Sequence, residues 1–168
     1  MMYVLFQQQT VTLLKMWKTE IFVKVSFSGF FPWTLKYLHY VRDGKLNREE
    51  WEIMKSHVDI GTRIIGEYPA DIFWMAGAIA GAHHEKWNGS GYPKGLKGED
   101  IPIAARIAAI SDVFDALLSA RPYKEPWPLE KALALMKEES GSHFDPVLID
   151  VFFESLEEIL AIREEFPD

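Results

Sequence analysis

A segment made almost entirely of small and apolar residues is the feature that most limits how this chain can fold. Residues 70–84 read ADIFWMAGAIAGAHH. A helix that is apolar on every side has to be buried against other elements. The small residues Ala76, Gly77, Ala80 and Gly81 permit a neighbouring helix to approach closely. The segment is therefore predicted to be a helix in the core of the molecule.

The same helix ends in two adjacent histidines, His83 and His84, which run directly into a Gly-Tyr-Pro loop. Neighbouring imidazoles at the end of an apolar helix are costly to bury unless their ring nitrogens are used. A metal ion is the usual partner for such nitrogens. The pair therefore makes metal binding the first functional hypothesis.

The rest of the chain after residue 45 also shows helical periodicity. Asn47 and Glu50 resemble a capping box at the start of an amphipathic helix over residues 47–65. Asp145 followed by Pro146 is typical of an N-cap and a first helical residue. Further helices are predicted over residues 101–120, 128–140 and 147–166.

Strand-like alternation is absent after residue 45, so the predicted fold class is all-α, a compact multi-helix bundle. Its longest helix, over residues 101–120, is expected to turn one face to the core. The residues on that face are Ile103, Ile107, Ile110, Phe114, Leu117 and Leu118.

Composition narrows the functional classes. The chain has 168 residues, 48% of them apolar, and a formal net charge of −7, which argues against a general DNA-binding surface. It has no cysteine, so a metal would be held by histidines and carboxylates, and such ligands suit Fe, Mn, Zn or Ni. No apolar run is long enough for a membrane span, and the first residues make a poor signal peptide, which predicts a cytoplasmic protein.

The first 44 residues differ from the remainder. They hold five Lys and Arg residues against two acids, and ten of the 23 aromatic residues of the chain. Their helical pattern is broken at Gly29 and Pro32. We interpret residues 1–44 as an atypical, irregular N-terminal segment and residues 45–168 as the helical domain. The apolar character of the segment suggests that it packs against a second copy of the chain, giving a homo-oligomer.

Four polar side chains occupy apolar helical surroundings on successive helices: His57, His83, His84 and Asp112. Helices packed in a bundle can direct such residues at one point, so these four are the candidate metal ligands. Each also has a structural alternative. His57 alone can be a hydrogen-bonded core residue, and Asp112 an internal hydrogen-bond acceptor. Asp115 competes with Asp112 for either role.

Consecutive residues of a helix diverge by about 100°. His83 and His84 would therefore serve one ion awkwardly. They would more easily face two ions, or one of them would orient a ligand instead of binding the metal. The other histidines, His39 and His143, are expected to be structural.

Three segments in order carry a resemblance to a known family: GKLNREEWEIMKSHVDIGTRII, HHEKWNGSGYPKGLKGEDIPIAARIAAISDVFDALLSARPYK and SGSHFDP. They lie within about residues 43–153, and this part of the chain resembles HD-GYP domains, a subgroup of the HD metal-dependent phosphohydrolases. The resemblance implies an all-α fold with two or three metal ions and hydrolysis of the bacterial messenger cyclic di-GMP in signal transduction.

The resemblance also assigns roles to residues. It makes His57, His83, His84 and Asp112 metal ligands, and Gly91, Tyr92 and Pro93 the GYP signature, with Tyr92 and Pro93 at the substrate. Arg121 and Lys124 match basic residues that contact the substrate phosphates, a role in keeping with an anionic diester in an acidic protein.

One part of the family pattern is missing. The name-giving His-Asp pair is expected about 30 residues before His57, and an ungapped count places Ser28-Gly29 there. His39 lies nearby but is followed by Tyr40 and not by an acid. In the family the aspartate bridges two metals, so its loss predicts a single ion held mainly by the three histidines.

Two functional hypotheses follow. The first is a metal-dependent phosphodiesterase acting on cyclic di-GMP or a related cyclic dinucleotide. The second is a catalytically inactive module that binds the dinucleotide, or that docks a GGDEF-type partner through the GYP loop. The sequence leaves open which one holds, and we treat enzymatic activity as uncertain at this point.

Overall fold

The computed structural model describes residues 47–66, 70–119 and 125–165 of the chain. This part is helical, and it contains no β-strand beyond an isolated bridge between Ser140 and Phe144. The all-α prediction is therefore confirmed. The elements are α4 (Arg48–Lys55), α5 (His57–Ile65), α6 (Asp71–Ala82), the 3-10 helix η1 (Gly98–Asp100), α7 (Ile103–Leu118), α8 (Leu129–Glu138), α9 (Pro146–Glu154) and α10 (Leu156–Glu165).

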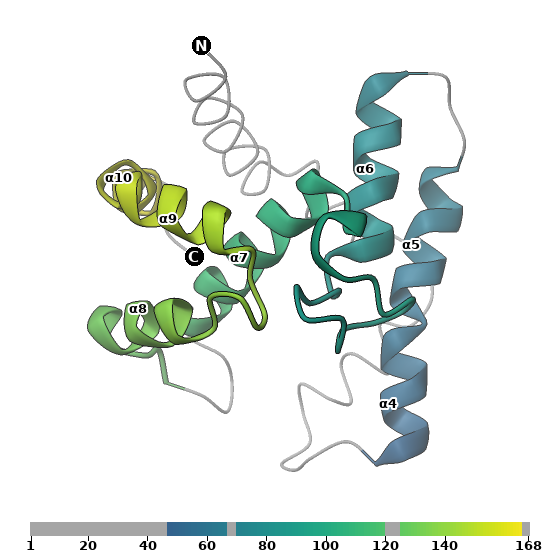
Figure 1. Cartoon of the computed structure of the whole chain (residues 1–168). Helices are drawn as coiled ribbons and strands as arrows, with labels where there is room; N and C mark the ends of the chain where they lie inside the picture. Colours follow the sequence, from purple (N-terminus) through teal and green to yellow (C-terminus); the bar gives the residue numbers. More distant parts are fainter. Residues whose placement is uncertain (1–46, 67–69, 120–124, 166–168) are drawn as a thin grey trace.

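Helix α7 lies between two groups of helices (Figure 1). On one side α5 and α6 run alongside each other as a hairpin, and α6 contacts α7. On the other side α8 and α9 pack against α7, and α10 packs against α9. The loop that follows α6 and leads into α7 sits at the lower end of the hairpin, close to the junction of α4 and α5 (Figure 1).

The predicted helix over residues 47–65 consists of two helices that meet at Ser56. The capping box is present, since the Asn47 side chain accepts a hydrogen bond from the Glu50 backbone at 2.9 Å and the Glu50 carboxylate accepts one from the Asn47 backbone at 2.9 Å. The Ser56 hydroxyl donates to the Ile53 carbonyl at 2.6 Å. A hydroxyl that bonds back to its own helix competes with the backbone ladder, which accounts for the break just before His57.

The largest core surrounds α7. It joins α7 to α8, α9 and α10, and its buried members include Phe114, Met136 and Phe152. Two smaller clusters, one of them formed by Ile79 with Ala104 and Ala108, hold α6 against α7. The small residues of α6 that were predicted to permit close packing instead face α5: a Cβ on Gly77 would lie 3.9 Å from the Ile65 side chain, and one on Gly81 would lie 3.4 Å from the Thr62 hydroxyl.

Two packing predictions were only partly right. The core position predicted for α6 holds for its second half, whereas Ile72 and Trp74 in its first turns are 56% and 73% exposed. The contacts of α6 with the α7 cluster begin at Met75, one residue after Trp74. Ile103, predicted to face the core, is 49% exposed, whereas Ile101, Ala104 and Ala105 beside it are buried in the two smaller clusters.

The C-terminal prediction needs one correction as well. Asp145 is the N-cap of α9, accepting from the Val147 backbone at 2.9 Å, and Pro146 is the first helical residue, as expected. The single helix predicted over residues 147–166 is however interrupted at Ser155, where α9 ends and α10 begins.

Several predictions concern residues outside the described ranges. They include the irregular segment 1–44, the structural role of His39, and the phosphate contacts of Arg121 and Lys124. Within the described ranges, none of the helices has the length and apolar character needed to cross a lipid bilayer.

Candidate metal centre

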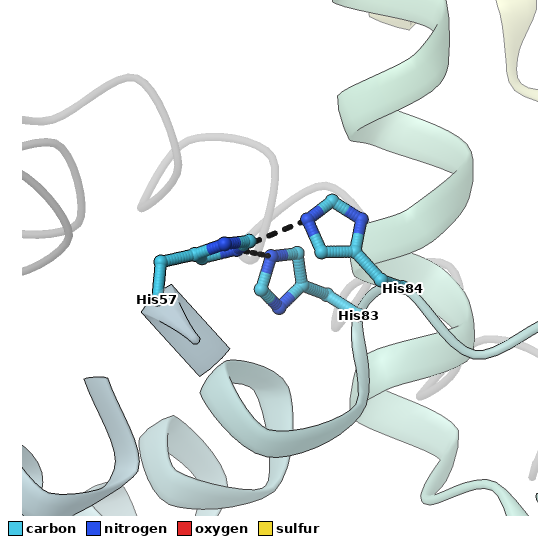
Figure 2. A group of neighbouring side chains, drawn as sticks. All are labelled: His57, His83 and His84. Carbon is cyan, nitrogen blue, oxygen red and sulfur yellow. Dashed lines mark hydrogen bonds between the residues drawn. The ribbon is translucent and has the colours of Figure 1, made fainter. Parts of the chain in front are cut away.

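Three imidazoles meet where α5 begins and α6 ends (Figure 2). The Nε2 atom of His57 lies 3.1 Å from Nε2 of His84 and 3.4 Å from Nε2 of His83. One ligand atom from each of the three residues falls within 4.8 Å of the other two. The structure thus brings together three of the four ligands predicted from the sequence.

The other ring nitrogens fix the orientation of two of these imidazoles. Nδ1 of His57 lies 2.6 Å from the Met54 carbonyl oxygen, and Nδ1 of His83 lies 2.9 Å from the Ile79 carbonyl oxygen. A carbonyl oxygen only accepts hydrogen bonds, so each Nδ1 must carry the proton and donate it. In the neutral rings, Nε2 is therefore the unprotonated nitrogen, and its lone pair points toward the meeting point.

This arrangement fits a metal ion. The unprotonated Nε2 atoms of His57 and His83 lie 3.4 Å apart, and they repel each other unless a cation lies between them. Nitrogens bound to one transition ion at about 2.0–2.1 Å are roughly 2.9–3.4 Å apart, and the two distances from His57 Nε2, to His84 and to His83, lie in this range. A ligand histidine that donates its other N–H to a backbone carbonyl is also the usual second layer of such sites.

The expectation that His83 and His84 would diverge is corrected by the end of α6. The last helical residue is Ala82, and His83 is the C-cap. His84 lies in the turn that follows, so the 100° step of a continuing helix does not apply to it. The two rings are tilted toward each other with centroids 4.0 Å apart, and both reach the same point.

Asp112, the fourth predicted ligand, is on α7 and is not part of this three-histidine cluster. Its charge nevertheless acts close by. Burial, together with the negative charge of Asp112, raises the pKa of Tyr92 to about 12. The Tyr92 phenol is thus a stable hydrogen-bond donor at neutral pH, and ligation by Asp112 stays a prediction.

The GYP loop folds back onto the end of α6. The Tyr92 backbone N–H donates to the His84 carbonyl at 3.2 Å, and the Tyr92 ring stacks on the His84 imidazole with centroids 4.8 Å apart. Gly91 allows this approach, because a Cβ at this position would lie 2.3 Å from the backbone nitrogen of Lys86 and 2.5 Å from the Cα of Glu85. Pro93, the last residue of the signature, is exposed.

Glu85 is a residue that the sequence reasoning missed. Its side chain is only 2% exposed, and its two carboxylate oxygens accept the backbone N–H groups of Lys94 at 2.7 Å and Leu96 at 3.0 Å. These two hydrogen bonds connect the far end of the GYP loop to Glu85, the residue that directly follows His84. The signal was available, since an acid directly after an apolar helix and two histidines needs a partner if it is buried.

His143 has a structural role, as expected. Its backbone carbonyl accepts the Trp87 N–H at 3.0 Å, and its ring stacks on Phe144. Burial lowers the pKa of this imidazole to about 4, and the nearby charge of Lys86 acts in the same direction.

Comparisons with known proteins bear on the family of this chain. A family model described as HD domain matches residues 31–148. The chain is 46% identical over 127 residues to the 3'3'-cGAMP-specific phosphodiesterase 2 of Vibrio cholerae, covering 76% of this chain and 24% of that protein. It is 44% identical over 128 residues to a cyclic di-GMP phosphodiesterase of Thermotoga maritima, covering 76% and 35% respectively. The chain thus spans between a quarter and a third of the length of these relatives.

The fold has a solved counterpart. The crystal structure of a cyclic GMP-AMP specific phosphodiesterase of Vibrio cholerae (V-cGAP3) matches with a TM-score of 0.54 at 22% identity, covering 90% of this chain and 34% of that one. At this identity the match speaks for the fold. Together with the family model and the sequence relatives, it leads to one conclusion: the chain belongs to the HD domain family, and the HD-GYP resemblance of its sequence is confirmed.

Proposed function

We propose that this chain is a metal-dependent phosphohydrolase domain of bacterial cyclic dinucleotide signalling. Its substrate would be cyclic di-GMP or a related cyclic dinucleotide, the class named for its relatives. The observation that carries the proposal is the convergence of the Nε2 atoms of His57, His83 and His84. The His57 atom lies 3.1 Å from that of His84 and 3.4 Å from that of His83.

His57, His83 and His84 would hold one divalent ion, of iron, manganese, zinc or nickel. Such an ion supplies Lewis-acid polarisation of a phosphoryl oxygen and a more acidic bound water. All three ligands are neutral imidazoles, so the full charge of the ion would be available to a diester anion. The limit of one ion rests on the sequence, which contains no His-Asp pair. Asp112 remains a proposed additional ligand.

The surrounding residues would bind and orient the diester. The Tyr92 hydroxyl, whose pKa is raised to about 12, keeps its proton at neutral pH and can donate it in a hydrogen bond to a phosphate oxygen. Gly91 and Pro93 shape the loop that presents Tyr92. Arg121 and Lys124 are proposed to neutralise the second phosphate, since guanidinium and ammonium groups bind phosphate oxygens by charge-assisted hydrogen bonds.

A second candidate function is binding of the same dinucleotide without turnover. What favours it is the ligand set, since the cluster among the described residues contains imidazoles only, and the sequence lacks the aspartate that bridges two ions in the family. In that case the exposed Pro93 end of the GYP loop would serve to dock a GGDEF-type partner. A homo-oligomer formed through residues 1–44 is a separate proposal.

The decisive experiment combines metal analysis with a hydrolysis assay. The purified chain should contain one transition ion and hydrolyse cyclic di-GMP, 3'3'-cGAMP or bis(p-nitrophenyl) phosphate. Changing both His83 and His84 to Ala should remove the ion and any hydrolysis. His143→Gln serves as the control, since His143 is a histidine outside the cluster, and this variant should keep both properties.

The outcomes separate the candidates. One ion per chain with measurable hydrolysis supports the phosphodiesterase. One ion with dinucleotide binding and no hydrolysis supports the binding module. Hydrolysis that survives in the His83→Ala/His84→Ala variant contradicts the site assignment.

A further inference from the structure

A row of three aromatic rings leads from the metal centre to the surface of α4. The first is the imidazole of His84, on which Tyr92 stacks with centroids 4.8 Å apart and an interplanar angle of 28°. The indole of Trp51 follows, in edge contact with Tyr92 at 5.9 Å and 73°. Trp51 is therefore two ring contacts away from a candidate ligand of the ion.

The Trp51 side chain does not belong to the core. It is 45% exposed, and helix α4 has no buried residue at all. An edge-to-face contact occupies at most one face of a ring, so the indole keeps apolar surface in contact with solvent. A scattered exposed aromatic needs no explanation, but this one is connected to the three histidines through the Tyr92 ring.

We propose that Trp51 is a stacking platform for a nucleobase of the cyclic dinucleotide whose phosphate lies at the three histidines. The inference rests on the proposed function and adds the part of the site that recognises the base. A nucleotide bound by phosphate to the ion must place its bases beside the centre, and an indole offers the largest flat apolar surface available to a base there. Tyr92 supports the indole through its edge contact and holds it toward His84.

The experiment compares the affinity for three ligands, namely Zn²⁺, inorganic phosphate and cyclic di-GMP, by calorimetry on the full chain. Trp51→Ala should weaken cyclic di-GMP binding about 5- to 150-fold, the loss expected for removing one stacked base. The affinities for Zn²⁺ and phosphate should stay unchanged, because neither has a base. Trp51→Phe, which keeps a ring, should lose less than Trp51→Ala.

Trp74→Ala is the matched control. Trp74 is 73% exposed and lies in the first turn of α6, at the opposite end of that helix from His83. Its removal also deletes an exposed indole, but away from the centre, and should leave all three affinities unchanged.

The results distinguish this inference from the proposed function. If wild-type protein binds cyclic di-GMP and Trp51→Ala binds it equally well, the platform is wrong and the function stands. If Trp51→Ala also loses Zn²⁺ or phosphate, Trp51 merely supports Tyr92 and His84, and the platform is again wrong. If wild-type protein binds Zn²⁺ and phosphate but no cyclic dinucleotide, both the platform and the proposed function fail.

Discussion

The carboxylate of Glu85 shows how a residue without contact to the substrate can matter for a metal site. It is buried, follows His84 directly, and accepts two backbone N–H groups from the far end of the GYP loop. Hydrogen bonds to a charged acceptor are worth more than neutral ones. Glu85 therefore fixes the loop that stacks Tyr92 on His84, and so acts as a positioning residue for the imidazole.

We predict that Glu85→Gln weakens metal binding about tenfold or more, in the range usual for groups that orient ligands. A glutamine amide has one accepting oxygen, so one of the two N–H groups would face an NH₂ group instead. The measurement is a titration of Zn²⁺ into metal-free protein.

Glu99→Gln is the control for Glu85→Gln. It changes an exposed carboxylate in the same loop region, in η1, and should bind Zn²⁺ like the wild type. Equal affinities of Glu85→Gln and the wild type would show that the loop anchor does not act on the imidazoles.

At this scale the sequence indicated the candidate ligands better than the residues that support them. His57, His83 and His84 stood out because imidazoles in apolar surroundings need partners, and the structure brings all three together. Glu85 and Trp51 did not stand out. The exposure of Trp51 depends on which helices pack against α4, and that information is not local.

Two loops that are far apart in sequence are joined beside the metal centre. Trp87 donates its backbone N–H to the His143 carbonyl at 3.0 Å, and the Asn88 backbone donates to the Ser142 carbonyl at 2.9 Å. The contact ties the loop after α6 to the loop between α8 and α9. His143 is partly buried in it with its pKa lowered to about 4.

This contact predicts a pH dependence of stability. In the unfolded chain the His143 pKa returns to about 6.5, so between pH 6.5 and 4 the unfolded state binds more protons than the folded state. Stability should fall as the pH drops through that window and be unaffected by this group above it. Between pH 7 and 5 the loss due to His143 should be about 1 kcal/mol, less than the full shift implies because the ring is partly solvent-exposed.

Denaturant unfolding of metal-free wild-type and His143→Gln protein at pH 7 and pH 5 measures the effect. The wild type should lose more stability than the variant over this interval. All other groups are common to the two proteins, so the difference between them isolates His143. An identical loss in the two proteins would contradict the assignment.

Helices were the most predictable elements, because caps and periodicity are local signals. The capping box at Asn47 and the N-cap at Asp145 are present as predicted. The breaks at Ser56 and Ser155 were missed, since both lie within sequences that continue the helical pattern. Ser155 is buried, so its place is set by packing between helices.

At the scale of the whole molecule, a bound ion would join α5 to the end of α6, two helices that already pack against each other. His57 begins α5, whereas His83 and His84 follow α6, and only α6 of this hairpin makes extensive contact with α7. An ion bound to all three would therefore link the α5–α6 hairpin at its open end.

Metal binding should accordingly raise the stability of the fold by mass action. At an ion concentration of 100 times Kd the gain is about 2.7 kcal/mol, and for a domain of this size that corresponds to roughly 5–10 °C in Tm. Thermal unfolding with Zn²⁺ and with a chelator measures it. The His83→Ala/His84→Ala variant should show no difference between the two conditions, and a wild type indifferent to Zn²⁺ would contradict the site.

Domain-level predictions depended on the family resemblance. The fold class followed from periodicity, but the roles of Tyr92, Arg121 and Lys124 came from motif matches. The boundary placed at residues 44 and 45 remains a prediction, and the HD domain match begins ahead of it, at residue 31. Local signals in residues 1–44 conflict with one another, so no physical rule assigned them a structure.

The hydrogen bonds from Nδ1 have one more consequence. Met54 lies in the last turn of α4 and Ile79 in the last turns of α6, and their carbonyls hold the imidazoles of His57 and His83. The orientation of each ring is thus fixed by the helical turn that precedes it in the chain. If either helix end unwinds, its carbonyl no longer holds the imidazole in this orientation. Unwinding of these terminal turns should therefore accompany the release of a bound ion.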